Sequence, residues 1–174
     1  MQKAFEDSPA EYDERVLTFI DILVWRSIVE RSLTYPSLRK RIPNAVHSLG
    51  TLTEKYCTEE TEEHPPEDEF AQFSDSIIIS IPRRHDLDVG RMIKLVTEFQ
   101  SSVLFSGFLI RGGITAGPMF HQGRVAFGPA LNRAYELDSK IANFPRVVID
   151  PSLERIVKRQ AKNVPKHWTF VWQE

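Results

Sequence analysis

Residues 73–80, FSDSIIIS, place one carboxylate, Asp75, between two serines at the start of a β-branched run. The run favours a buried strand, and its isoleucines are Ile77, Ile78, Ile79 and Ile81. The interior of such a strand has no place for an ionised acid, whereas its end leaves an acid hydrated or free to bind a cation. A second apolar run, VLTFI at residues 16–20, also ends on an acid, Asp21. Two such carboxylates that meet in space would form a metal site, although aspartate at a strand end is also an ordinary turn or cap residue.

The whole chain, residues 1–174, has the composition of one globular domain. Its length can bury a proper core, and 41% hydrophobic with 26% charged residues is ordinary for a soluble protein. The net charge of −2 provides no field for nucleic acid, and the one cysteine, Cys57, excludes an intrachain disulfide. The chain does not begin like a signal peptide, and no apolar run approaches membrane-spanning length. We therefore predict a cytoplasmic protein without nucleic-acid or membrane binding.

The segments around the central stretch predict a β-hairpin over 70–73 and 76–81, with Asp75 in or beside its turn. Seven acids in eleven residues and two prolines predict a solvated acidic loop before the hairpin, over 57–69. The elements expected earlier are a loose segment at 1–14, a strand at 16–20, a helix at 22–32, a turn of helix at 38–42 and a helix at 44–56.

After the hairpin, the strongest helical pattern covers 86–104, with Asp86 as its N-cap. Its expected buried face consists of Leu87, Met92, Ile93, Val96, Phe99 and Val103. The remaining expected elements are a strand at 108–116 broken by Gly112 and Gly113, a turn at 121–123, a strand at 124–127, a helix at 130–141, a strand at 146–149, a helix at 151–161 and a strand at 168–172. This order predicts an α+β fold with one sheet and helices packed against it.

Five motifs resemble, in order, those of the class III nucleotide cyclase catalytic domain. They are FIDILVW (19–25), FSDSIIIS (73–80), LIRGGITAG (109–117), FGPALNRAYELD (127–138) and PRVVID (145–150). Within these motifs, the segments FSDS, RGGIT, GPALN and AYELD are most similar to those of the pyrimidine cyclases of the bacterial Pycsar antiphage system. The resemblance implies a ferredoxin-like central antiparallel sheet flanked by helices, active as a homodimer with shared active sites. It also implies conversion of UTP, ahead of CTP, to the 3′,5′-cyclic monophosphate and pyrophosphate, with the product signalling to a separate effector.

The resemblance assigns a metal site to Asp21, Asp75 and the backbone carbonyl of Ile22. Two Mn²⁺ or Mg²⁺ ions per site would be the cofactors, and hard oxygen donors suit both cations. Phosphate would be held at the start of the following helix by the backbone amides of Leu23, Val24 and Trp25. The family's usual glycine and phenylalanine are replaced here by valine and tryptophan, so the turn can differ in shape.

Asn132 matches the asparagine that orients the ribose from the partner subunit. The family's transition-state arginine lies four residues further on, where this chain has Glu136. Arg111 on the glycine-rich strand is the catalytic candidate that could take over, with a structural salt bridge as the alternative role. The family reads purines at two positions that are Ala71 and Val125 here, and neither side chain can form a hydrogen bond. This base pocket argues for a pyrimidine and leaves the choice between UTP and CTP open.

Two other functions stay open at the level of sequence. A catalytically degenerate cyclase-fold protein that binds a nucleotide or regulates a partner is favoured by Glu136. The presence of Asp21, Asp75 and Asn132 counts against it. A phosphate-handling metalloenzyme on another α+β scaffold is supported only by the pair of acids.

Overall fold

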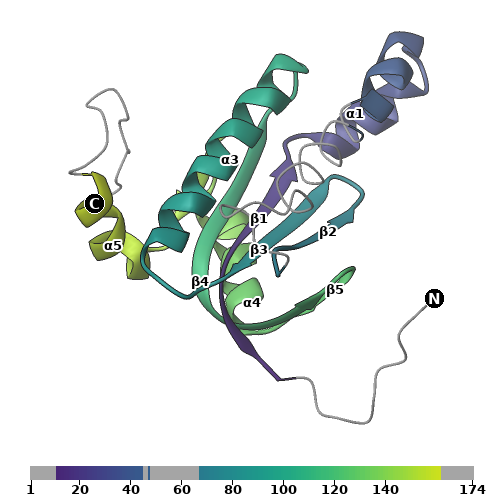
Figure 1. The fold of residues 1–174 in the computed structure, drawn as a ribbon. Helices are drawn as coiled ribbons and strands as arrows, with labels where there is room; N and C mark the ends of the chain where they lie inside the picture. Colours follow the sequence, from purple (N-terminus) through teal and green to yellow (C-terminus); the bar gives the residue numbers. More distant parts are fainter. Residues whose placement is uncertain (1–10, 45–46, 48–66, 162–174) are drawn as a thin grey trace.

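The computed structural model describes residues 11–44, 47 and 67–161, which form one curved sheet with helices on both faces (Figure 1). The strands are β1 (Asp13–Ile22), β2 (Glu69–Phe73), β3 (Ser76–Pro82), β4 (Ile110–Gln122), β5 (Val125–Phe127) and β6 (Val147–Ile149). The helices are α1 (Trp25–Ser32), a segment at 36–44, α3 (Leu87–Phe105), α4 (Pro129–Glu136) with its π-helical continuation η1 (Leu137–Ile141), η2 (Pro151–Leu153) and α5 (Glu154–Ala161). None of the described helices is long and apolar enough to span a membrane.

The strand β1 lies in the middle of the sheet, between β3 and β4. The strand order is β2-β3-β1-β4-β5 with antiparallel neighbours, and β6 adds a parallel pairing with β4. The register across β1 sets Asp21 opposite Ser76 on β3 and opposite Arg111 on β4. The end of β1 therefore lies beside the turn between β2 and β3, as two strand-end acids with a common site require. The predicted α+β architecture is confirmed.

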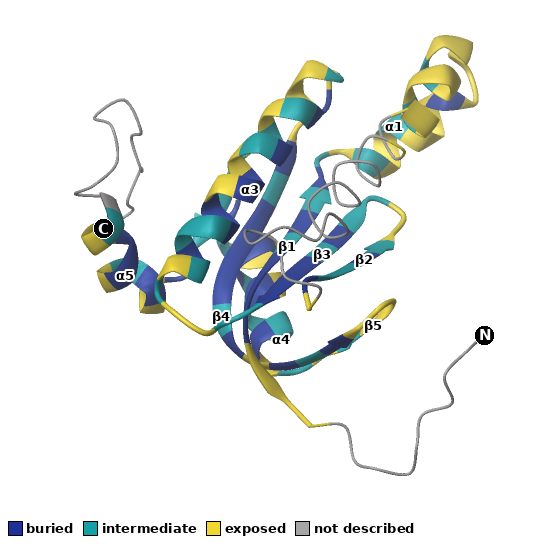
Figure 2. Cartoon of the chain, viewed as in Figure 1, coloured by how far each residue is buried: buried dark blue, intermediate teal, exposed yellow. Residues whose placement is uncertain are grey.

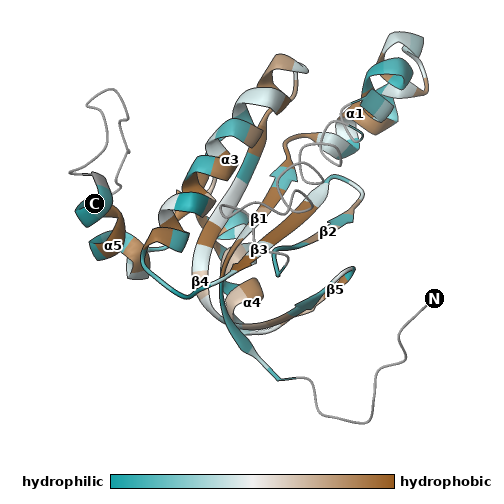
Figure 3. Ribbon diagram, in the orientation of Figure 1, coloured by the Kyte–Doolittle hydropathy of each residue, from teal (hydrophilic) through white to brown (hydrophobic). Residues whose placement is uncertain are grey.

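Side chains of β1 alternate between two hydrophobic layers. Val16, Ile20 and Ile22 pack in the larger layer with α3 and α5. Leu17 packs on the opposite face in a smaller layer with Met119, Ala130 and Ala134. Figure 2 shows the buried residues gathered on β1, β3, β4 and the inner side of α3, and Figure 3 shows many of the same segments as apolar. The sheet is therefore covered by α3 on one face and by α4 on the other.

Two adjacent glycines let β4 pass close to its neighbours. A Cβ at Gly112 would lie 2.4 Å from the backbone oxygen of Phe19, and a Cβ at Gly113 would lie 2.5 Å from the Cβ of Leu137. Any larger residue would force the backbone apart at these contacts. The predicted break is wrong, because β4 runs without interruption from Ile110 to Gln122.

The predicted hairpin and long helix are present, with local differences. Leu87, expected on the buried face of α3, is 75% exposed, because it lies about 200° around the helix from the buried Val89. Asp86 occupies the N-cap position, but its side chain makes no capping hydrogen bond and pairs with Arg159 of α5. Residues 13 and 14, expected in a loose segment, belong to β1. The predicted strand at 168–172 and most of the predicted helix at 44–56 lie outside the described residues.

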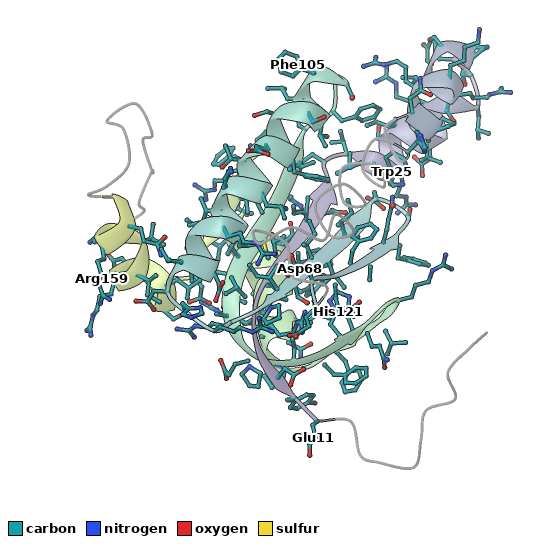
Figure 4. The ribbon with its side chains drawn as sticks, in the orientation of Figure 1. Glu11, Trp25, Asp68, Phe105, His121 and Arg159 are labelled. Carbon is teal, nitrogen blue, oxygen red and sulfur yellow. The ribbon has the colours of Figure 1, made fainter. Side chains whose placement is uncertain are left out.

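The last residues of the predicted acidic loop, Asp68 and Glu69, contact the rest of the domain through their side chains. Residues 57–66 of that loop lie outside the described part of the chain. Asp68, labelled in Figure 4, is 6% exposed and forms an ion pair with Arg91 of α3. Glu69 opens β2, and its Oε2 accepts a hydrogen bond from the backbone amide of Gly123 at 2.8 Å. This bond joins the edge strand β2 to the turn between β4 and β5, so the sheet curls toward itself.

Candidate metal and phosphate site

Asp21 and Asp75 meet at one end of the sheet. Asp21 is the penultimate residue of β1, and Asp75 lies in the tight turn that joins β2 to β3. The hydroxyl of Ser76 donates a hydrogen bond to Oδ1 of Asp21 over 3.2 Å, which ties the start of β3 to the end of β1. The structure thus brings together the two acids that the sequence predicts as metal ligands.

The surroundings of Asp21 disfavour its negative charge unless a positive charge is close by. Burial, a hydrogen bond with Asp75, the charge of Asp75 and the charge of Asp138 together raise the pKa of Asp21 to about 6, while Arg111 opposes the shift. Two neighbouring carboxylates cannot both ionise without repulsion unless a cation lies between them. The pair therefore favours either a shared proton or a bound metal ion.

The donor set fits a hard divalent cation that takes the rest of its ligands from water and substrate. No group of three or more His, Cys, Asp or Glu side chains that could hold a metal occurs among the described residues. Mg²⁺ is commonly bound through one or two carboxylates together with substrate phosphates. Ile22 ends β1 with a buried side chain, so its part in such a site would be that of its backbone carbonyl.

Arg111 forms a bridge between Asp21 and a third acid, Asp138. Its Nη2 lies 3.4 Å from Oδ2 of Asp21, and its Nε lies 3.3 Å from Oδ1 of Asp138. Asp138 is 2% exposed, and burial raises its pKa while Arg111 opposes the shift. The predicted salt bridge of Arg111 therefore exists, and it lies inside the candidate site.

Sequence reasoning missed Asp138, although the residue closes one of the quoted motifs. A signal was present, because Ala130, Ala134 and Leu137 define an apolar helical face and Asp138 follows on it. The predicted helix at 130–141 changes to a π-helix at Leu137–Ile141, and the missing Cβ of Gly113 lets this turn lie against β4. Together these features place an acid beside Arg111.

The connection from β1 to α1 has an unusual backbone. The amide of Leu23 donates to the carbonyl of Leu109 at 2.8 Å, and Val24 follows with φ 56° and ψ 21°, in the left-handed region. The helix therefore begins at Trp25 and not at residue 22 as the sequence predicts, because a left-handed residue ends the strand and cannot continue a right-handed helix. Of the three amides that the sequence predicts to hold phosphate, that of Leu23 is therefore already engaged within the sheet.

The aromatic ring of Trp25 connects the two acidic turns. Its indole Nε1–H donates to the hydroxyl of Ser74, the residue before Asp75, over 3.1 Å. The ring is half-buried and packs against the larger hydrophobic layer. Figure 4 shows Trp25 at the base of α1.

The helix α4 carries the predicted Asn132, which is exposed. Glu136, at the position expected for an arginine, forms ion pairs with Arg133 at 3.5 Å and Lys140 at 3.1 Å. Arg133 is held in addition by Asp150, whose Oδ2 lies 2.6 Å from its Nε. Both cations near Glu136 are therefore engaged in ion pairs on their own subunit.

The two predicted base-pocket residues do not share a face of the sheet. Ala71 is buried on β2 opposite Ile78. Val125 is 39% exposed on β5, and its neighbour Ala126 packs with the layer around Leu17. Because side chains alternate along a strand, Val125 points to the other face.

Comparison with known proteins places this fold. No family model and no curated protein sequence matches the chain. The structure is similar to the adenylyl cyclase CyaB from P. aeruginosa, with a TM-score of 0.64 and 13% identity over 86% of this chain and 82% of that chain. It is also similar to the catalytic core of a rhodopsin-guanylyl cyclase with converted specificity in complex with ATPalphaS, with a TM-score of 0.63 and 14% identity over 85% of this chain and 82% of that chain. The chain has the fold of the class III nucleotide cyclase catalytic domains.

Proposed function

We propose that this protein is a nucleotide cyclase that converts UTP, with CTP as the second choice, to the 3′,5′-cyclic monophosphate and pyrophosphate. The observation that carries the proposal is the meeting of Asp21 and Asp75 beside Arg111 at one end of a cyclase-type sheet. The two carboxylates could hold the divalent cations that accompany a triphosphate, and the guanidinium of Arg111 could contact the triphosphate itself. The fold supports a cyclase over a phosphate-handling enzyme on another scaffold.

The reaction requires the ribose 3′-hydroxyl to attack the α-phosphorus of its own nucleotide while pyrophosphate leaves. Two Mn²⁺ or Mg²⁺ ions would make that hydroxyl more acidic and neutralise charge on the triphosphate. Asp21 and Asp75 would hold these ions, with the backbone carbonyl of Ile22 as a further ligand. With its pKa raised to about 6, Asp21 is largely ionised at neutral pH and able to act as a ligand, and at lower pH a proton competes with the cation.

Arg111 would bind the triphosphate. In the structure its guanidinium is shared between Asp21 and the buried Asp138. When Asp21 is engaged as a metal ligand, Arg111 can keep its contact with Asp138 and offer its remaining N–H groups to a phosphate oxygen. The amides of Val24 and Trp25, at the start of α1, would support the same group.

The ribose would be oriented by Asn132 of a second subunit, in a homodimer with shared sites. The exposure of Asn132 on α4 is compatible with that role. Glu136 cannot stabilise developing phosphate charge, and its ion pairs with Arg133 and Lys140 show why an acid is tolerated there. In this proposal Arg111 stabilises the developing phosphate charge, the role that an arginine at position 136 would otherwise have.

The proposed preference for a pyrimidine rests on the resemblance and on Ala71, which cannot pair with the polar edge of a purine, so a purine would lose hydrogen bonds when buried against it. Val125 points to the other face of the sheet and does not line the same pocket within one subunit. The resemblance to Pycsar cyclases further suggests that the cyclic product is a second messenger read by a separate effector in antiphage defence.

The direct test incubates the purified protein with each of the four ribonucleoside triphosphates and Mn²⁺, and identifies products by mass spectrometry. We expect a cyclic pyrimidine nucleotide, with kcat/KM at least about tenfold higher for UTP or CTP than for ATP or GTP. A dominant cyclic purine would refute the base preference and leave the cyclase proposal intact. No cyclic product from any of the four would refute the cyclase proposal.

The second candidate is a cyclase-fold protein that binds nucleotides without chemistry, and the acid at position 136 favours it. The same incubation separates the two candidates when it is paired with a binding measurement. Metal-dependent triphosphate binding without a cyclic product would support the second candidate.

A further inference from the structure

Two residues with strained backbones flank the candidate metal ligands. Val24 and Ser74 are the non-glycine residues with positive φ in the described part of the chain, each at 56°. Val24 lies three positions after Asp21, and Ser74 lies immediately before Asp75. A β-branched residue in the left-handed region is a rare outlier, and such strain persists only where the surrounding structure holds it.

One side-chain hydrogen bond joins the two strained turns. The Nε1–H of Trp25 donates to Oγ of Ser74 over 3.1 Å, although the residues are 49 positions apart in the chain. Trp25 directly follows Val24, and its ring packs against the larger hydrophobic layer, so the donor is fixed by the core. The Gln72 amide lies 3.4 Å from the backbone oxygen of Ser74, on the strand side of the same turn.

We propose that the Trp25–Ser74 hydrogen bond is a latch that sets the separation of the Asp21 and Asp75 turns before cations bind. This inference rests on the proposed function, and it makes Trp25 and Ser74 positioning residues for the metal site. Neither side chain needs to touch a cation or substrate.

The latch is needed because the two carboxylates are carried by elements that are held to different degrees. Asp75 lies in the two-residue turn between β2 and β3, and β2 is an edge strand. Asp21 is the penultimate residue of β1, which is paired with β3 on one side and with β4 on the other. A hydrogen bond from Trp25, just after β1, to Ser74 therefore holds the turn of Asp75 beside the end of β1.

The test compares Trp25→Phe, Ser74→Ala and the double variant. Trp25→Phe keeps an aromatic ring in the core and removes the donor, and Ser74→Ala removes the acceptor. Ser101→Ala is the matched control, because it deletes an exposed serine hydrogen bond on α3. Each variant is titrated with Mn²⁺ in the presence of 3′-deoxy-UTP, which lacks the attacking hydroxyl and cannot cyclise.

We expect each single variant to weaken Mn²⁺-dependent binding by about three- to tenfold, and the double variant to be no weaker than the singles. In turnover assays the Mn²⁺ concentration for half-maximal rate should rise by a similar factor. In Ser74→Ala the kcat at saturating Mn²⁺ should stay within about twofold, because excess cation restores the spacing. Ser101→Ala should leave all three quantities unchanged.

A second readout does not depend on nucleotide chemistry. In the cation-free protein, amide hydrogen exchange over residues 73–76 should be faster in Trp25→Phe and Ser74→Ala than in the wild type and in Ser101→Ala. The latch proposal would be refuted if amide hydrogen exchange were unchanged in both Trp25→Phe and Ser74→Ala. It would also be refuted if their losses of Mn²⁺-dependent binding added in the double variant. A wild-type protein that binds no triphosphate would refute the proposed function, while exchange would still decide on the latch.

Discussion

The Arg111 guanidinium lies 3.3 Å from the carboxylate of Asp138, an acid that is 2% exposed at the start of a π-helical turn. An anchored arginine loses less freedom when it binds a phosphate than a mobile one, so the contact prepares Arg111 for its proposed role.

We predict that Asp138→Asn lowers kcat/KM by about tenfold, because Arg111 then keeps only its contact with Asp21. The melting temperature at pH 8 should not fall, because burial already disfavours the ionised acid. Glu30→Gln is the control, since it removes an exposed Arg–Glu pair on α1. Unchanged kinetics in Asp138→Asn would remove Asp138 from the site.

Replacement of either predicted metal ligand should abolish cyclisation. Asp21→Ala and Asp75→Ala remove carboxylates from a strand end and from a turn, so the domain should stay folded by circular dichroism. Activity is measured as cyclic product per enzyme per minute at saturating Mn²⁺. Retention of more than about a tenth of the wild-type rate, a loss of less than about 1.4 kcal/mol in the barrier, would contradict the two-metal assignment.

Protonation of Asp21 gives a pH prediction for stability. Its folded pKa of about 6 lies above the unfolded value, so the folded state binds the proton more tightly and the cation-free protein loses stability as pH rises from about 4 to 6. Asp21→Asn removes this loss. We expect the variant to melt a few degrees above the wild type at pH 8, with the difference vanishing near pH 4. A variant that melts below the wild type at pH 8 would contradict the shift.

The same pKa gives a pH prediction for metal binding. Below pH 6, Mn²⁺ must compete with the proton on Asp21, so its apparent affinity should fall by up to about tenfold per pH unit. Isothermal titration between pH 5 and 8 measures this slope. A flat profile across that range would show that Asp21 is ionised throughout.

The acids of the candidate metal site were predictable because each lies at one end of an apolar run, and the pattern alone locates a strand end. Residues 16–20 and 76–81 fix two strands, and their antiparallel pairing then brings Asp21 next to the turn of Asp75. Local sequence predicts the two strands and their ends, whereas their pairing is a contact between distant segments that the structure supplies.

The remaining features of the site depend on contacts between distant segments. The left-handed backbone at Val24 comes directly after the bond between Leu23 and Leu109, a contact between distant segments that no local propensity encodes. The position of Asp138 depends on a π-helical turn that packs against Gly113. Tertiary packing overrides the helical pattern in both places, so the start of α1 and the anchor of Arg111 could not be predicted from sequence.

The proposed sharing of sites between subunits has its own test. Asp75→Ala and Asn132→Ala should each be inactive as homodimers, because every site then lacks either a metal ligand or the ribose contact. In a mixture, subunit exchange should form heterodimers in which one site combines wild-type Asp75 with wild-type Asn132 and the other site lacks both. Random pairing makes about half of the dimers mixed, each with one intact site, so the mixture should recover about a quarter of the wild-type rate. Persistent inactivity, with exchange demonstrated by mass spectrometry of tagged subunits, would mean that Asn132 acts within its own subunit or not at all.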